Sequence, residues 1–335
     1  MKISDNEILL SVQDLKVYFK SEDEIARAVD GISLDVRRKE TVCIVGESGC
    51  GKTVAALSIM GLVPNPPGEI AGGRILFRGI NLLDIDDTEM QKIRGNQIAM
   101  IFQEPLTSLN PVFTIGDQIG EAINIHENIT DKEVIKRSQQ LLKDVGIDSP
   151  AERLSDYPHQ LSGGQRQRVM IAMALACNPD LIIADEPTTA LDVTVQAQIL
   201  RLMNAIQKRR SMSVLYITHD LGVVSKVADR VCVMYAGILA EQGSRTNIFT
   251  GPKHPYTQAL LASLPSREKR GQRLYSIPGT VPHPAYKPRG CPFHPRCQHA
   301  IQTCREQYPE MCDYGGGHHA RCPVLFDGNG ENWSE

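Results

Sequence analysis

The sequence predicts an α/β fold built on a mostly parallel β-sheet, with an antiparallel β layer, a helical insertion and a small cysteine-rich C-terminal domain. Three observations lead to this prediction. Short continuous apolar runs alternate with helical patterns, as in a parallel sheet covered on both faces. The strand pattern disappears between Glu104 and Gln160. Five of the nine cysteines lie within the last 45 residues.

Strands are expected at short strand-like runs that are rich in apolar residues. These runs are Ile32–Arg37, Thr41–Val45, Arg74–Arg78, Ile98–Phe102, Leu181–Ala184, Val214–Thr218 and Val231–Met234. Two shorter N-terminal runs, Ile8–Val12 and Leu15–Phe19, predict the antiparallel layer. Helical spacing of apolar residues predicts helices at Lys52–Met60, Gly116–Ile125, Glu133–Val145, Gly163–Ala176 and Thr257–Leu264.

A domain boundary is expected near residue 250, because prolines become frequent after Gly251. We therefore expect one domain at residues 1–250, with its helical subdomain at about 104–171. The remainder, 251–335, forms a C-terminal extension that includes the cysteine-rich segment 291–322.

Charge and apolar content restrict the partners and the location of the chain. The 36 Lys and Arg residues are balanced by 39 Asp and Glu residues, so no basic surplus indicates a nucleic-acid partner. No signal peptide is visible at the N-terminus. The most apolar run, Val169–Cys177, spans nine residues, whereas a membrane helix needs about 20. We expect a soluble, cytosolic chain that reaches a membrane only through a partner.

A complete phosphate-binding loop lies between an apolar strand and a helix. Its residues are Gly46, Glu47, Ser48, Gly49, Cys50, Gly51, Lys52 and Thr53. The glycines let successive backbone N–H groups face a phosphate at the positive end of the following helix. The Lys52 ammonium group is expected to reach the β- and γ-phosphates, and the Thr53 hydroxyl to bind Mg²⁺.

An acidic pair follows the apolar strand Leu181–Ala184. Asp185 is expected at the edge of the sheet where ligands bind in open α/β folds, holding Mg²⁺ through water. Glu186 is suited to polarise an attacking water as general base. Taken alone, such a pair is about as typical of a solvated turn.

A helix start with two glycines is a further candidate anion site. The residues are Leu161, Ser162, Gly163, Gly164 and Gln165. Ser162 suits an N-cap position, but capping does not explain two glycines, each of which weakens a helix by about 1 kcal/mol. Backbone donors exposed at a helix start favour an anion.

Together these motifs resemble the ATP-binding subunits of ABC transporters, over about residues 1–250. The set comprises the phosphate loop, Gln103, Leu161–Gln165, Asp185-Glu186, Ala190-Leu191-Asp192 and His219. The resemblance implies an ABC-type ATPase in which Gln103 senses Mg²⁺ and water and couples to membrane subunits. It places Asp192 in a loop at a dimer interface. It assigns His219 to the γ-phosphate, keeping water and Glu186 in register.

The resemblance also implies ATP and Mg²⁺ as cofactors and an aromatic ring stacked on adenine. Phe19 is the candidate for this ring, and Tyr18 is the next choice. ATP is expected between two subunits, in contact with the phosphate loop of one and the Leu161–Gln165 motif of the other. The implied partners are a second ATPase subunit (in a heterodimer or a homodimer), two transmembrane permease subunits and an extracytoplasmic peptide-binding protein. The chain would then lie at the cytoplasmic face of the membrane.

Other segments resemble the oligopeptide, dipeptide and nickel uptake group, and most of all the first ATPase subunit of dipeptide permeases. They are Phe102–Pro111, His254–Thr257, Ile277–Gly279 and Gly290–Cys297. We expect ATP hydrolysis that drives import of dipeptides or oligopeptides. Import of nickel or another small solute is the alternative within the group. A soluble ABC ATPase acting on nucleic acid and a regulatory nucleotide-binding protein are alternatives outside it.

The cysteine-rich segment has too few aliphatic residues to form a core, which indicates a metal or disulfides, and disulfides are disfavoured in the cytosol. Cys291, Cys297, Cys304 and Cys322 lack the close pair typical of zinc sites, and their wider gaps suit an iron–sulfur cluster. The resemblance implies a structural 4Fe–4S centre on these four thiolates, with Cys312 spare or exchanging with Cys322. Two alternatives stay open: zinc with help from His294, His299, His318 or His319, and free or bridged cysteines.

Overall fold

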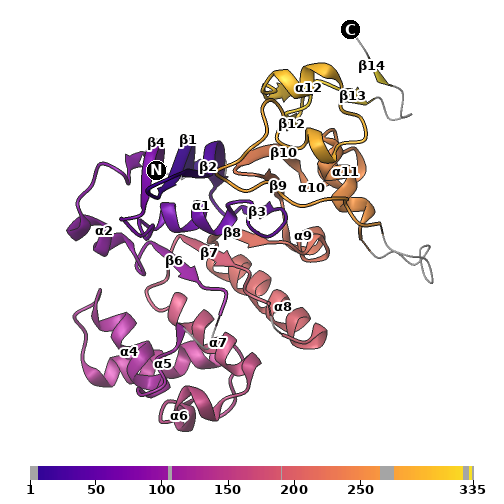
Figure 1. Cartoon of the computed structure of the whole chain (residues 1–335). Helices are drawn as coiled ribbons and strands as arrows, with labels where there is room; N and C mark the ends of the chain where they lie inside the picture. Colours follow the sequence, from indigo (N-terminus) through magenta and orange to yellow (C-terminus); the bar gives the residue numbers. More distant parts are fainter. Residues whose placement is uncertain (1–6, 105–107, 190, 265–274, 327–331, 334–335) are drawn as a thin grey trace. The chain divides into compact units, whose positions relative to one another are not determined.

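The structure is a computed structural model that describes residues 7–104, 108–189, 191–264, 275–326 and 332–333. Two compact units are distinguished. Unit 1 takes in Val36–Glu40 and Asp84–Tyr216, and unit 2 takes in Leu9–Asp35, Thr41–Leu83 and Ile217–Glu335. Each unit is described separately (Figure 1).

Unit 2 contains a mixed sheet in the order β11-β12-β10-β9-β3. Its strands are β3 (Thr41–Val45), β9 (Arg230–Tyr235), β10 (Ile238–Ser244), β11 (Cys312–Asp313) and β12 (His319–Ala320). β3 pairs with β9 in parallel, whereas β10 is antiparallel to both β9 and β12. All residues of β3 are buried, because its continuous apolar run suits a strand covered on both faces.

The antiparallel layer of unit 2 has the strand order β2-β1-β4-β5. Its strands are β1 (Ile8–Lys20), β2 (Ile25–Arg37), β4 (Gly68–Phe77) and β5 (Ile80–Asn81), of which only Ile8, Val36 and Arg37 belong to unit 1. Two separate N-terminal strands were predicted, and this was wrong, because both runs belong to one continuous strand, β1. Asp14 has a φ of 46°, and the β1–β4 register shifts between Gln13 and Val17. This irregularity lets the strand continue where the apolar pattern breaks.

The helices of unit 2 are short. They are α1 (Lys52–Ile59), α9 (Leu221–Val227), α10 (Arg245–Thr250), α11 (Pro255–Ala262), η2 (His294–Arg296) and α12 (Gln302–Glu306). A last pair of strands, β13 (Leu325–Phe326) and β14 (Asn332–Trp333), is antiparallel. Helix α11 begins two residues earlier than predicted, because Pro255 suits the first helical turn and His254 caps it through Nδ1, 3.0 Å from the Tyr256 amide nitrogen.

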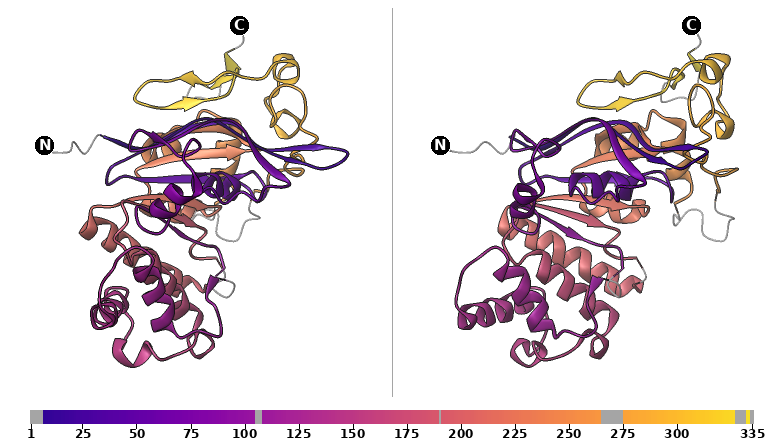
Figure 2. Two further views of the ribbon diagram at one scale, coloured as in Figure 1. Left: turned by 90° about the vertical axis from the view of Figure 1, so that its left-hand side faces the viewer. Right: turned by 60° about the vertical axis from the view of Figure 1, so that its left-hand side comes forward.

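Unit 1 combines parallel strands with packed helices. Strand β6 (Ile98–Ile101) pairs in parallel with β7 (Leu181–Asp185), and β8 (Ser213–Thr218), whose first four residues belong to unit 1, follows β7 in the strand order. The helices are α2 (Asp87–Ile93), α4 (Ile115–Asn124), α5 (Asp131–Asp144), α6 (Pro150–Arg153), η1 (Pro158–Gln160), α7 (Gly163–Ala174) and α8 (Val193–Arg210). Between β6 and β7 the described residues are helical or irregular, as predicted, and α4, α5 and α7 pack against one another (Figure 2).

A buried carboxylate of the mixed sheet of unit 2 binds two later segments of the chain. Glu241 of β10 is fully buried and accepts hydrogen bonds from the amides of Lys253 and His254 at 2.7 and 2.9 Å. Its other partner is Nε2 of His318, at 2.6 Å. A buried charge is tolerated when its hydrogen bonds are satisfied in this way. Glu241 therefore connects residues 252–254 to the segment before β12.

His254 is predicted to make unit 2 sensitive to acid. Burial lowers its pKa from 6.5 to about 4, so the folded chain resists a proton that the unfolded chain accepts. The stability that depends on neutral His254 is complete above about pH 6.5 and is lost as the pH falls from there towards 4. From pH 7 to pH 5 this loss amounts to about 2 kcal/mol.

The measurement is urea unfolding at both pH values, for the wild type and for His254→Asn. Asparagine can still cap α11 but does not titrate, so acid should destabilise this variant by about 2 kcal/mol less than the wild type. Equal losses in the two proteins would contradict the prediction.

No helix within the described ranges has the length and apolar character that a membrane span requires.

Candidate functional site

The phosphate loop lies in unit 2, between β3 and α1, and packing requires two of its three glycines, Gly46 and Gly51. A Cβ atom at Gly46 would lie 2.1 Å from the carbonyl oxygen of Met234, and one at Gly51 would lie 2.2 Å from that of Ala28. Gly51 also has a φ of 103°, which side chains with a Cβ rarely adopt. The loop can therefore pass close to β2 and β9 only with glycine at these two positions.

Lys52 begins α1 and is buried, with 5% of its surface exposed. Its ammonium group donates to the carbonyl oxygens of Gly46 and Glu47 at 2.8 and 2.9 Å. Burial raises the pKa of the neighbouring Cys50 thiol. Ser48, Gly49 and Thr53 are exposed. The loop thus presents one positive charge and an accessible hydroxyl at the start of a helix, an arrangement that suits phosphate.

The aromatic candidates Tyr18 and Phe19 are both half-buried near the end of β1. The Tyr18 hydroxyl donates to Asp30 at 2.8 Å, and burial together with this hydrogen bond raises the pKa of Tyr18 to about 12. The ring of Phe19 packs close to Gly68. Tyr18 is therefore held at its hydroxyl, whereas Phe19 is placed by packing alone.

The acidic pair of unit 1 stands at the end of β7. Asp185 is buried as the last residue of that strand, and Glu186 follows with a φ of 45°. The Glu186 carboxylate accepts hydrogen bonds from Gln103 Nε2 at 3.3 Å and from Thr189 Oγ1 at 2.8 Å. A non-glycine residue in the left-handed region costs energy and is enriched at functional sites. The structure thus brings together Gln103 and Glu186 and adds Thr189, which the sequence analysis missed.

The helix start at Ser162 is a complete capping box. The Ser162 hydroxyl accepts from the Gln165 amide at 3.3 Å, and Gln165 Oε1 accepts from the Ser162 amide at 2.9 Å. A Cβ at Gly164 would lie 2.8 Å from a methyl group of Val195 in α8. Capping and packing thus account for three of these residues. Gly163 has no such constraint within 3.4 Å and lies exposed next to the exposed Ser162.

Two remaining candidates lie at helix starts. Asp192 caps α8 in unit 1, with Oδ1 accepting from the amides of Thr194 and Val195. His219 follows β8 in unit 2 and is exposed. Ala190, Pro105, Leu106 and Thr107, which belong to the motifs quoted above, lie outside the described residues.

Four of the C-terminal cysteines are electrostatic neighbours. Burial and then the nearby thiols of Cys291, Cys297 and Cys304 raise the pKa of Cys322 to about 12. Burial likewise raises the pKa of Cys291 to about 11, with contributions from Cys304 and Cys297. Cys312 is exposed and is not among these neighbours. Within the described part of the chain, no three His, Cys, Asp or Glu side chains are close enough to hold a metal ion.

Glu47 makes two contacts within unit 2 that were not predicted from the sequence. Its amide donates to the Tyr256 hydroxyl at 2.9 Å, and its carboxylate accepts two hydrogen bonds from Arg296 at 2.9 and 3.0 Å. Tyr256 and Arg296 lie in the segments His254–Thr257 and Gly290–Cys297, which resemble the oligopeptide, dipeptide and nickel uptake group. No local pattern could have shown that both segments meet the phosphate loop.

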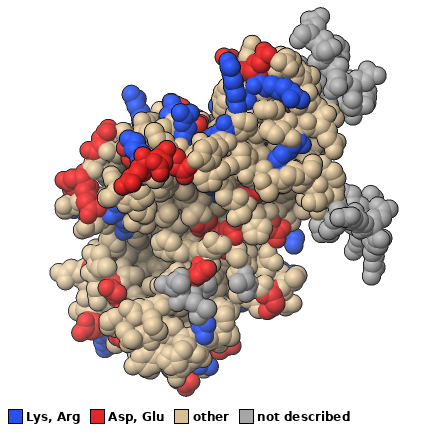
Figure 3. Space-filling model, viewed as in Figure 1, with Lys and Arg blue, Asp and Glu red and all other residues tan. Residues whose placement is uncertain are grey.

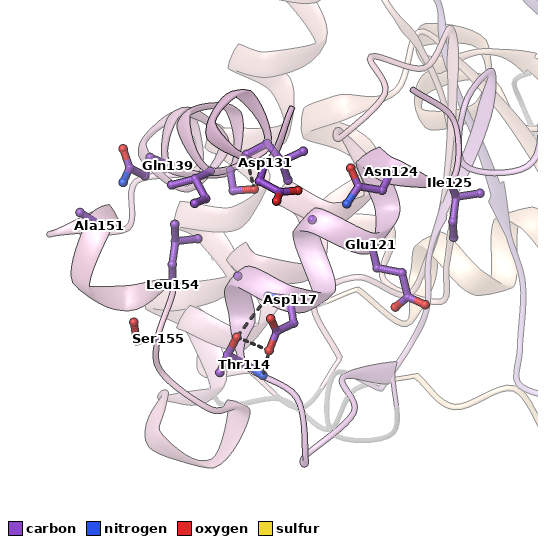
Figure 4. A pocket seen from close by; sticks show the side chains of 15 residues that line it. Thr114, Asp117, Glu121, Asn124, Ile125, Asp131, Gln139, Ala151, Leu154 and Ser155 are labelled. Atoms are coloured by element: carbon purple, nitrogen blue, oxygen red, sulfur yellow. Dashed lines mark hydrogen bonds between the residues drawn. The ribbon is translucent and has the colours of Figure 1, made fainter. Parts of the chain in front are cut away.

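A cavity of about 850 Å³ lies between α4, α5 and α6 of unit 1. Figure 4 shows Thr114, Asp117, Glu121 and Asp131 around it, with Asp117 engaged in the cap of α4. None of its lining residues belongs to the predicted site.

Comparison with known proteins places these observations in a family. Residues 29–189 match the family described as ABC transporter. Residues 240–304 match the C-terminal region of oligopeptide/dipeptide transporters.

Curated relatives are similar over almost the whole chain. A probable peptide ABC transporter ATP-binding protein of Sinorhizobium fredii is 50% identical over 94% of this chain and 95% of its own length. The dipeptide transport ATP-binding protein DppD of Bacillus subtilis is 51% identical over 94% of both chains.

Among solved structures, a dimeric ATP-binding cassette in a post-hydrolysis state with ADP and Pi superposes with a TM-score of 0.63. It is 29% identical, and the match covers 70% of this chain and 98% of that one. These similarities confirm the ABC ATPase fold with its mixed α/β sheets. The chain belongs to the ATP-binding subunits of ABC transporters, and it is an ATPase.

Proposed function

We propose that this ATPase drives the import of dipeptides or oligopeptides through a membrane permease. The C-terminal match to oligopeptide/dipeptide transporters and the names of the relatives support the peptide cargo. The observation that carries the hydrolytic part is the Glu186 carboxylate, held by Gln103 and Thr189 at the end of β7. Such a carboxylate is suited to orient and deprotonate a water molecule.

In the proposed mechanism, each residue of the ABC motifs has a distinct role toward ATP. Lys52 and the loop amides bind the phosphates of ATP, and Phe19 stacks on adenine. Thr53, Asp185 and Gln103 would hold Mg²⁺, which neutralises phosphate charge; the buried carboxylate of Asp185 and the exposed hydroxyl of Thr53 are suitable oxygen ligands. Glu186 accepts the proton of the attacking water, and His219 keeps that water in line.

A second subunit completes the site in this proposal. Ser162, Gly163, Gly164 and Gln165 of one subunit, together with Asp192, contact the ATP held by the phosphate loop of the other. ATP therefore stabilises the dimer, and ATP hydrolysis lets the two subunits separate. That alternation would move the two permease subunits between inward- and outward-facing states, with peptides delivered by an extracytoplasmic binding protein. The dimer is proposed as a heterodimer with a sister ATPase, and the homodimer is the alternative.

The partners distinguish this proposal from its rivals. A tagged chain purified from its own host membranes in mild detergent should bring down permease subunits, and ATP should drive uptake of a labelled dipeptide in vesicles. Uptake of nickel instead would identify the alternative cargo. Recovery of nucleic acid without membrane subunits would overturn the proposal. On the face shown in Figure 3, the basic side chains of the described residues lie among acidic ones, a mixture that does not indicate a nucleic-acid surface.

We further propose a small C-terminal domain at 251–335 in which Cys291, Cys297, Cys304 and Cys322 hold a 4Fe–4S cluster. Four neighbouring thiols, three of them buried, are a suitable donor set. A cluster spreads its four ligands over several iron atoms, so these thiols need not meet at one ion as they would around zinc. When bound, the cluster would stabilise a segment that is poor in aliphatic residues.

Iron and acid-labile sulfide in anaerobically purified protein test this assignment. We expect about four iron atoms per chain, in agreement with one cluster. Cys322→Ser should lose most of the iron, whereas the matched variant Cys312→Ser should retain it. Stoichiometric zinc without iron, or equal loss in both variants, would contradict the proposal.

A further inference from the structure

We propose that Arg296 is a positioning residue for nucleotide binding, which holds the phosphate loop through Glu47 and thereby couples the cysteine-rich segment to the nucleotide. The inference rests on the proposed function and concerns how the same site is regulated. All residues that carry it lie in unit 2.

The contact has the geometry of a specific ion pair. Both terminal nitrogens of Arg296 donate to the two carboxylate oxygens of Glu47, at 2.9 and 3.0 Å. The Arg296 side chain is 5% exposed and that of Glu47 is 29% exposed. A bidentate arginine–carboxylate pair fixes orientation as well as distance, which a lysine at the same place would not do.

Arg296 is itself held from several sides. Its Nε donates to the carbonyl oxygen of Pro278 at 2.8 Å, and its guanidinium lies 5.8 Å from the ring centre of Tyr235 and 6.0 Å from that of Phe293. The buried rings of Tyr235, Tyr256 and Phe293 pack with centroids 4.6 to 5.3 Å apart. Arg296 therefore belongs to a rigid cluster and cannot follow a displaced Glu47.

Electrostatics gives the contact a consequence for the nucleotide. Glu47 is the second residue of the phosphate loop, and its negative charge would repel phosphate groups unless it were neutralised. Arg296 supplies that neutralisation from a position adjacent to Cys297. The Glu47 amide is fixed in addition by the Tyr256 hydroxyl. A change in residues 291–297 that moves Arg296 therefore alters the position of Glu47 in the phosphate loop. Because such coupling is reciprocal, a bound nucleotide stabilises this arrangement of residues 291–297 by the same free energy.

Calorimetric titration of the full chain with MgADP tests the proposal. Arg296→Gln should raise the Kd about tenfold, or about 1.4 kcal/mol. The double variant Glu47→Gln/Arg296→Gln should return to within about threefold of the wild type, because a neutral amide no longer repels phosphate. The exposed Arg289, two residues before Cys291, provides the matched control, and Arg289→Gln should not change the Kd.

A purely structural role gives a different result. It predicts a lower melting temperature for Arg296→Gln with an unchanged Kd, or no rescue in the double variant, and either result overturns the inference. If Arg296→Gln does not fold, Arg296→Lys is used, for which an unchanged Kd overturns the proposal and an increase of about threefold supports it. The proposed function itself is refuted if the wild type does not bind MgADP, or if Lys52→Ala binds MgADP as tightly as the wild type.

Discussion

Glu186→Gln is expected to reduce ATP hydrolysis by a factor of at least about 100 while ATP binding persists. The amide keeps the size of the side chain and can still interact with Gln103 and Thr189, but it cannot accept a proton from water. Loss of a general base commonly costs a factor of 10² to 10⁴ in rate. Phosphate release from MgATP by the purified variant measures the effect.

The same variant should accumulate as an ATP-bound dimer, because the ATP hydrolysis that is proposed to separate the subunits no longer occurs. Light scattering with and without MgATP detects this change in mass. The control is Glu152→Gln, an exposed acidic residue in α6 of the same unit, which should hydrolyse ATP like the wild type. Undiminished hydrolysis by Glu186→Gln would show that another group activates the water.

Lys52→Ala is expected to weaken ATP binding by about 10- to 100-fold. The buried ammonium group is the one cation of the phosphate loop, and a hydrogen bond to a charged group contributes about 1.5–3 kcal/mol. Titration with MgATP in the Glu186→Gln background separates binding from hydrolysis.

Packing must be distinguished from charge in this experiment. Lys52→Met keeps an aliphatic chain of similar length and should lose as much affinity as Lys52→Ala. The exposed Lys132 at the start of α5 offers a control, and Lys132→Met should bind ATP normally. Normal affinity in both Lys52 variants would remove this residue from the phosphate site.

Local patterns predicted the parts of the fold that depend on local physics. The run Thr41–Val45 is β3 residue for residue, because five consecutive residues suited to burial leave few alternatives. The helix at Gly163 begins as predicted, since Ser162 caps it, and ends two residues earlier than expected, at Ala174. Helix ends carry weaker signals than capped starts.

What the sequence analysis missed depends on long-range contacts. Strand β10 was not predicted, because the charged Glu241 interrupts its apolar pattern. The hydrogen-bond partner of Glu241, His318, is 77 residues away in the sequence. Arg296 and Glu47 are 249 residues apart. The resemblance identified their segments as family features, but only the folded chain shows what they contact.

The measurement that tests the central claim most directly is the ATPase rate per chain as a function of protein concentration. If each nucleotide site needs residues from two subunits, dilution should lower the rate per chain towards zero, and added partner subunit should restore it. A constant rate per chain at every dilution, from a protein shown to be monomeric, would contradict the account.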